Sequence, residues 1–205
     1  MNSHRLAPPL VLLLGLLFAT ACSDESGSDG GGGGTGTVGG GGKGGNVTGL
    51  QPAELLPLQP GNTSTYTVTA KVDVPACIEG VRVVTATGGP TEFEGRQAYT
   101  LTSLCQDQDT RMALDDGEVL EWIPNFWARA LPAPVEAGFT WSSGAGRYTW
   151  TDVGSITVPA GTFSDCWERT SADPLVQTNT YCAGVGMVRA DEQGHEAVLT
   201  SYVVQ

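Results

Sequence analysis

The sequence predicts an all-β fold for most of this 205-residue chain. Short segments rich in Val, Thr and aromatic residues alternate between apolar and polar positions, a pattern typical of strands with one buried face. Turn-forming Gly, Pro, Asn and Asp separate these segments at short intervals. A helical pattern is limited to Pro124–Leu131, which is too short to change the class. We expect a single domain of about 10–12 short antiparallel strands forming a curved sheet, a sandwich or a partly open barrel.

The first 21 residues have the pattern of a secretory signal peptide. His4 and Arg5 give a basic start, an apolar run extends from Leu10 to Phe18, and small residues follow at Ala19–Ala21. The apolar run is roughly half of the about 20 residues that a membrane-spanning helix needs. We therefore expect residues 1–21 to direct export and no later segment to span a membrane.

Cys22 follows the signal peptide directly. The run Phe18-Ala19-Thr20-Ala21-Cys22 resembles the lipobox of bacterial lipoproteins, whose cysteine thiol receives a diacylglycerol before cleavage, although Ala19 stands where Leu is commonest. The resemblance implies a membrane anchor of acyl chains such as palmitate on Cys22 and a place in the cell envelope. Ser23 favours the outer membrane. The alternative is an ordinary cleavage site that leaves Cys22 unmodified.

Residues 22–49 are predicted to be a disordered tether, because Gly, Ser, Thr and Asp make up nearly all of this segment. A glycine-rich coil of this length reaches roughly 30 Å. The folded domain is expected over residues 50–205. The chain has a net charge of −12, so its surface repels phosphate backbones and anionic headgroups, and we expect no nucleic-acid partner.

The domain contains a regular series of predicted strands. The first alternates Tyr66 and Val68 with threonines, which indicates one buried face. The expected strands are, in chain order, 65–74, 81–87, 98–104, 110–114, 119–123, 139–142, 147–152, 155–158, 162–170, 176–182, 187–190 and 197–204.

Turn chemistry supports these boundaries. Asp116-Gly117 is a strong hairpin signal, and Val158-Pro159-Ala160-Gly161 fits a type I turn. Residues 57–63 and 134–140 share a Pro, an aliphatic residue, a Gly and a Thr at equal spacing, each before a strand. This similarity indicates either two similar halves or the same turn chemistry used twice, and we favour the second interpretation.

Four cysteines remain after Cys22, and an exported domain predicts two disulfides among Cys77, Cys105, Cys166 and Cys182. Residues that face each other across an antiparallel hairpin have position numbers with a constant sum. A turn at 172–175 therefore places Cys166 opposite Cys182, and a turn within 88–94 places Cys77 opposite Cys105. We predict these two local bridges. Zinc is the rival use of these cysteines, but there is no CxxC pair.

Several turn and strand motifs resemble a family of uncharacterised bacterial envelope β domains, many of them lipoproteins. The motifs are Pro57-Leu58-x-Pro60-Gly61-Asn62, Gly138-x-x-Trp141, Val158-Pro159-Ala160-Gly161-Thr162-Phe163-x-x-Cys166, Gly184-Val185-Gly186-Met187-Val188 and Leu199-Thr200-Ser201-Tyr202. This chain departs from the family at Ser64, where a Trp is frequent. The resemblance spans nearly all of residues 57–204 and implies a meandering antiparallel fold without an established activity.

The sequence offers no convincing catalytic or metal site. A hydrolase needs a nucleophile beside a base, but His195 is the sole histidine after the signal peptide, and we expect it to be solvated in a turn. Acidic residues cluster at 107–109 and 115–118, yet Asp116 is explained by the hairpin turn and Arg111 breaks the calcium-loop pattern. We expect no enzyme activity, no metal and no cofactor.

Phe126 and Trp127 are the candidate contact residues, because Pro124-Asn125 precedes them and places two large rings in an apparent loop. We expect a lipid-anchored binding or structural interaction module of the envelope, with a protein partner at such a surface. The alternative is a carrier of a hydrophobic ligand, for which small inward residues such as Ala98 and Val83 would leave room in an apolar cavity.

Overall fold

The computed structural model describes residues 49–71, 77, 79–105, 108–144, 146–173 and 177–205. The predicted signal peptide, Cys22 and the tether up to residue 48 lie outside the described residues. No helix among the described residues is both long and apolar enough to span a membrane. The described residues belong to one compact unit, which contains twelve strands and the short helix α1 (Pro52–Leu55).

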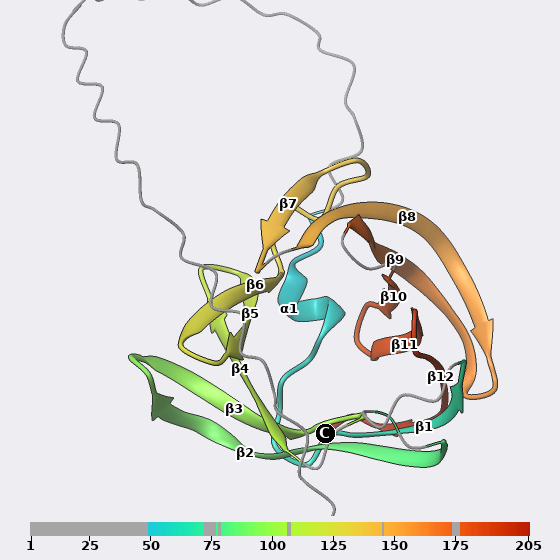
Figure 1. The fold of residues 1–205 in the computed structure, drawn as a ribbon, viewed down its shortest axis with the longest axis horizontal. Helices are drawn as coiled ribbons and strands as arrows, with labels where there is room; N and C mark the ends of the chain where they lie inside the picture. The colour runs from blue at the N-terminus through green and yellow to red at the C-terminus, as the bar shows by residue number, and fades with distance from the viewer. Residues whose placement is uncertain (1–48, 72–76, 78, 106–107, 145, 174–176) are drawn as a thin grey trace, which may run out of the picture. The chain divides into compact units, whose positions relative to one another are not determined.

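The strands form a single antiparallel sheet, as the sequence predicted. Their bounds are β1 Thr63–Ala70, β2 Gly80–Phe93, β3 Arg96–Thr102, β4 Asp109–Asp115, β5 Glu118–Ile123, β6 Phe126–Leu131, β7 Thr140–Ser143, β8 Gly146–Val158, β9 Gly161–Asp173, β10 Gln177–Cys182, β11 Gly186–Glu192 and β12 His195–Val203. Consecutive strands pair within β1–β6 and within β7–β12, and β1 also pairs with β12. The sheet therefore consists of two six-strand meanders and curves around α1 into a nearly closed barrel (Figure 1).

The turns follow the predicted chemistry with one correction. Asp116 and Gly117 both adopt positive φ, as a two-residue hairpin turn requires, and Val158 pairs with Gly161 across Pro159-Ala160. The possible helix at Pro124–Leu131 is wrong, because these residues form the β5–β6 turn and β6. Pro124 and Asn125 make the turn between Ile123 and Phe126, with Asn125 at a φ of 82°.

The two similar sequence segments form the same structure at the start of each meander. The Gly61 N–H donates to the Ala86 carbonyl and the Ala86 N–H to the Asn62 carbonyl, both at 2.9 Å. In the second half the Gly138 N–H donates to the Trp150 carbonyl (2.8 Å) and the Trp150 N–H to the Phe139 carbonyl (3.0 Å). Both glycines have a positive φ that disfavours other residues. The shared turn chemistry therefore begins two meanders of equal strand number.

Two disulfides join the cysteine pairs that the sequence predicted, Cys77–Cys105 and Cys166–Cys182. Cys166 faces Cys182 in the β9–β10 ladder with the expected register. The turn predicted for the other pair, within 88–94, was wrong, because the β2–β3 turn lies at Glu94-Gly95 and the register shifts twice along this hairpin. Cys77 precedes β2 and Cys105 follows β3, so both cysteines lie beyond the paired ends of the two strands.

Two tryptophans close the seam between the edge strands β6 and β7. The indole N–H of Trp141 donates to the Arg129 carbonyl, and that of Trp150 to the Pro132 carbonyl, each at 3.3 Å. Trp150 is fully buried and packs against Trp141, with ring centroids 5.1 Å apart. The same side chains thus fill the core and satisfy carbonyl groups at a place where the sheet has no backbone ladder.

We expect Trp150→Phe to destabilise the domain by about 2 kcal/mol, because it leaves the Pro132 carbonyl unsatisfied in a buried site. Trp127→Phe is the matched control, since the half-buried Trp127 indole also donates to a carbonyl, that of Glu94 at 3.1 Å, but this hydrogen bond is exposed to solvent. Its cost should stay below about 1 kcal/mol. Urea denaturation measures both values, and equal losses would contradict the role assigned to the seam.

Candidate functional site

The interior of the barrel contains a cavity of about 780 Å³. Most of its wall is apolar, which follows from the alternation of inward and outward residues along each strand. Apolar side chains of β2–β6 and β11 supply this wall, among them Val84, Leu101, Met112, Ile123, Ala128 and Met187. Val83, expected to face inward, is 50% exposed on the opposite face of β2.

Arg169 on β9 lies in the wall of this cavity, between two tyrosines of the neighbouring strands. Its guanidinium carbon is 5.1 Å from the centre of the Tyr148 ring and 5.9 Å from that of Tyr181. When the Asn179 amide is oriented so that its nitrogen donates to the Thr178 carbonyl (3.1 Å), its oxygen accepts from Arg169 Nη2 at 3.0 Å. Arg169 Nη1 donates to the Ala130 carbonyl at 3.4 Å.

The guanidinium of Arg169 is not fully satisfied by the described residues. Its Nε atom is buried and has no hydrogen-bond partner among them. Arg169 also forms no ion pair with a described carboxylate, in contrast to Lys71, Arg96, Arg129 and Arg189 at the surface. A buried donor without an acceptor costs about 1–3 kcal/mol, and more on a charged group. The cavity wall therefore contains a positively charged side chain, Arg169, with one N–H donor that no described residue accepts from.

Glu121 and Glu192 also line the cavity. Burial raises the pKa of Glu121, and the charge of Glu192 raises it further, although the charge of Arg169 opposes both effects. Tyr181 and Tyr66 are buried phenols, and burial raises the pKa of each. The Tyr66 hydroxyl donates to the Met187 carbonyl at 2.8 Å. The polar part of the described wall therefore contains the fixed positive charge of Arg169 and, at Glu121, a carboxyl group that burial discourages from ionising.

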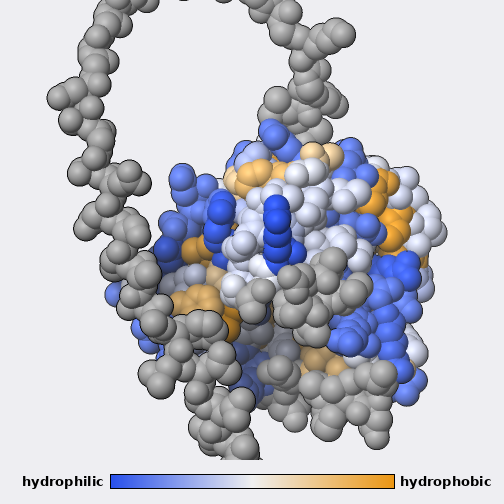
Figure 2. Space-filling view, turned by 45° about the horizontal axis from the view of Figure 1, so that its top comes forward, coloured by the Kyte–Doolittle hydropathy of each residue, from blue (hydrophilic) through white to orange (hydrophobic). Residues whose placement is uncertain are grey.

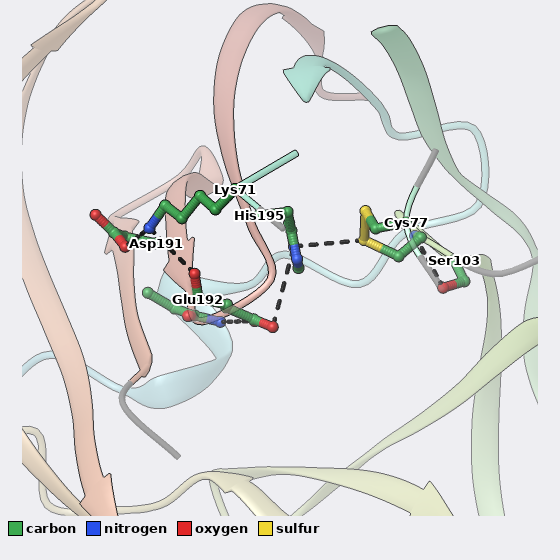
Figure 3. A network of polar contacts seen from close by, with 8 residues as sticks. Lys71, Cys77, Ser103, Asp191, Glu192 and His195 are labelled. Atoms are coloured by element: carbon green, nitrogen blue, oxygen red, sulfur yellow. Dashed lines mark hydrogen bonds and ion pairs between the residues drawn. A yellow bond between two sulfur atoms is a disulfide. The ribbon is translucent and has the colours of Figure 1, made fainter. Parts of the chain in front are cut away.

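His195 lies at another part of the cavity wall, beside the Cys77–Cys105 disulfide (Figure 3). The expectation of a solvated turn histidine is wrong: His195 begins β12 and is only 8% exposed. Its Nε2 is 3.4 Å from Cys105 Sγ and 4.0 Å from a Glu192 carboxylate oxygen. Lys71 pairs with Asp191 and donates to the Glu192 carbonyl at 3.1 Å. These contacts hold the end of β11, just before the turn that leads to His195.

Cys77, Cys105 and His195 are the group of metal-binding residue types that comes together among the described residues. Both sulfurs are committed to the disulfide, whereas zinc binds the thiolate.

The acidic residues that cluster in the sequence do not form a shared site among the described residues. Asp115 pairs with Arg96, Glu118 pairs with Arg129, and Asp116 occupies the turn, while Asp107 lies outside the described residues.

Phe126 and Trp127 lie at the end of β6 that adjoins the β5–β6 turn, away from the cavity wall. Phe126 is 46% exposed. Trp127 contacts Trp122 and Phe93, with ring centroids 5.4 and 6.2 Å apart, and Arg111 lies over the Phe93 ring at 5.5 Å. The two predicted contact residues therefore differ, because Trp127 is part of an aromatic cluster and Phe126 projects into solvent. A space-filling view shows a largely polar face with small separate apolar patches (Figure 2).

Arg169 and Glu121 were not predicted as site residues, although the sequence contains a signal for both. Arg169 lies two residues after the buried Trp167 and therefore on the same face of its strand. Glu121 lies between Val119 and Ile123, which also face inward. A charged residue in phase with the buried face of a strand indicates a paired or functional group.

No family model and no curated protein matches this chain. Two crystal structures are similar to it. One is a candidate lipoprotein from Parabacteroides distasonis, with 15% identity over 73% of this chain and 98% of that chain and a TM-score of 0.44. The other is a candidate exported protein with a YmcC-like fold from Bacteroides fragilis, with 12% identity, the same two coverages and a TM-score of 0.42. Neither similarity identifies a function for this chain.

We expect Glu121→Gln to raise the Tm at about pH 8 and to have little effect at about pH 4. A carboxyl whose pKa is raised in the folded state favours folding at low pH, and this advantage is lost as the pH rises through the folded pKa. The neutral amide of Gln does not ionise, so the variant avoids the loss of stability at high pH. Glu92→Gln, at an exposed site on β2, is the control and should change the Tm little at either pH. A lower Tm for Glu121→Gln at pH 8 would mean that the carboxylate stabilises Arg169 overall.

Proposed function

We propose that this chain is a lipid-anchored protein of the cell envelope whose β domain binds a small amphiphilic molecule inside the barrel. The cavity is the observation that carries this proposal. Its volume of about 780 Å³ falls within the range of roughly 300–1,000 Å³ for small-molecule sites, which are mostly apolar with a few polar groups. Protein interiors are otherwise close-packed, so folding alone gives no reason for this space.

The proposed anchor is an acylated Cys22. Ser23, the next residue, favours the outer membrane as its location. The lipobox-like run before Cys22 and the glycine-rich tether support this location, because a lipid-linked domain on a long coil stays near a membrane without inserting. The tether would hold the cavity within reach of membrane amphiphiles while the acidic surface keeps the domain off anionic headgroups.

An interaction module was favoured by the sequence and is the second candidate. The exposed ring of Phe126 supports it. However, the neighbouring Trp127 ring and indole N–H already have partners within the chain, so the exposed aromatic surface is smaller than the sequence indicated. The apolar cavity therefore favours ligand binding over protein docking.

The test uses the mature chain from residue 22 with Cys22→Ser, exported to an oxidising periplasm and purified without denaturant. We expect it to bind the neutral fluorophore N-phenyl-1-naphthylamine and to release it when alkyl amphiphiles are added. Ala128→Phe fills part of the cavity and should weaken binding about tenfold or more, equivalent to roughly 1.4 kcal/mol. Ala137→Phe, at an exposed turn position outside the cavity wall, should bind like the parent.

Near-ultraviolet circular dichroism establishes that both variants keep their packing. Thr110→Phe introduces the same ring at another point of the wall and replaces Ala128→Phe if that variant unfolds. The proposal fails if the folded parent binds neither the fluorophore nor any alkyl amphiphile. It also fails if cavity-filling variants that remain folded bind as well as the parent.

A further inference from the structure

We propose that the ligand of this cavity carries an oxyanion head, a carboxylate or a phosphate, on an apolar chain, and that Arg169 binds this head. The inference rests on the proposed function and adds the chemical class of the ligand. It depends on the packing of Arg169, on its vacant donor, on the lack of an ion pair and on the apolar wall beside it.

The packing of Arg169 leaves the edge of its guanidinium group for polar contacts. Tyr148 and Tyr181 lie near the guanidinium carbon with their rings at 5.1 and 5.9 Å, and such aromatic contacts hold the planar group in place. The five N–H donors of a guanidinium lie in its plane and require acceptors there. A ligand that completes this site must therefore supply oxygens at the edge of the plane.

The hydrogen bonds already made do not use all the donors. Asn179 and the Ala130 carbonyl take one hydrogen bond each from the two terminal nitrogens, the second of them long at 3.4 Å. The buried Nε has no partner among the described residues. An oxyanion can accept from Nε and a terminal nitrogen together, in the bidentate geometry that makes arginine the usual residue for carboxylate and phosphate recognition. A hydroxyl or amide head would leave the guanidinium without an ion pair.

The charge balance around Arg169 favours an anion over a cation. Burial lowers the pKa of Arg169, and Glu121 and Glu192 are among the groups that raise it, but neither carboxylate forms an ion pair with Arg169. A buried charge without a partner is costly, and a bound anion removes that cost. A cationic head near Glu121 would instead place a second positive charge beside a buried guanidinium that forms no ion pair with a described carboxylate.

The apolar chain of such a ligand has a wall next to this head site. Ala130, which accepts from Arg169 through its carbonyl, lies on β6 beside Leu131. Met112, Ile123 and Leu101 continue the wall over β4, β5 and β3. A molecule with its head at Arg169 and its chain along these strands would fill both parts of the cavity.

The experiment compares four ligands with the same chain and different heads: dodecanoate, dodecyl phosphate, dodecanol and dodecylammonium. Each displaces N-phenyl-1-naphthylamine from the mature Cys22→Ser chain, below its critical micelle concentration. We expect one or both oxyanions to bind about tenfold or more tightly than dodecanol, because charge-assisted hydrogen bonds are roughly twice as strong as neutral ones. The stronger of the two oxyanions distinguishes a carboxylate ligand from a phosphate ligand.

Arg169→Met should remove this preference while dodecanol affinity stays within about twofold. Arg189→Met is the matched control, because Arg189 is paired with Glu196 at the surface, and it should leave all four affinities unchanged. Arg169→Lys replaces Arg169→Met if that variant does not fold, because it retains the charge without the planar guanidinium. It should weaken oxyanion binding, but the oxyanion affinity should stay higher than the dodecanol affinity. Glu121→Gln should tighten the binding of dodecyl phosphate.

Three results would overturn the inference and leave the proposed function intact. They are equal affinities for dodecanol and the oxyanions, an unchanged oxyanion preference in folded Arg169→Met, and a preference for dodecylammonium that Glu121→Gln weakens. If none of the four ligands displaces the fluorophore and the fluorophore itself does not bind, the proposed function fails as well.

Discussion

The antiparallel pairing of β1 with β12 joins the two ends of the described fold, and the remaining architecture depends on it. Six ladder positions of β1, from Thr63 to Val68, are paired on one side with β12 and on the other with β2. This pairing places the first and last strands at the centre of the sheet and leaves β6 and β7 as its edges. A sheet with right-handed twist curves as strands are added, so the edges approach each other and an interior is enclosed (Figure 1).

The enclosure explains why the seam and the cavity have different chemistry. At the seam, Trp141 and Trp150 donate to backbone carbonyls and fill the space beside them. Towards the cavity, the inward residues include Ala128, Ala130 and Ala190, whose short side chains do not reach across the interior. A barrel of this size needs large inward side chains or a ligand to fill it. The short helix α1 fills one part, where Leu55 is fully buried.

The fold was largely predictable because the period-two alternation and the turn residues act locally. Asp116-Gly117 and Pro159-Ala160 located two of the hairpin turns, and alternation identified most strands. The expected strands 147–152 and 155–158 were wrong as separate elements, because they form the single strand β8, whose register shifts at Gly154. Disulfide pairing followed from hairpin register for Cys166 and Cys182, whereas the irregular β2–β3 hairpin defeated the same reasoning for Cys77 and Cys105. The β5–β6 hairpin was missed because Pro124-Asn125 followed by aromatic residues was interpreted as a loop or a short helix.

The candidate site was less predictable, because it depends on contacts between strands far apart in the chain. Arg169 and Tyr148 lie on the paired strands β9 and β8, but Glu121 comes from β5, and only the closure of the sheet brings it to the same wall. His195 was expected in solvent because its neighbours Gln193 and Gly194 are turn residues, yet the disulfide packs over it. Local patterns identify which strand face a residue occupies, but they do not show what lies across the barrel.

The most direct test of the account is a crystal structure of the mature Cys22→Ser chain with 12-bromododecanoate, because the anomalous signal of bromine locates the end of the chain independently of the head. We expect a carboxylate at Nε and a terminal nitrogen of Arg169, and a bromine peak inside the barrel against the apolar wall of β3–β6. A bromine peak on the outer surface, or a cavity closed by rearranged side chains with Arg169 turned away from it, would contradict the account.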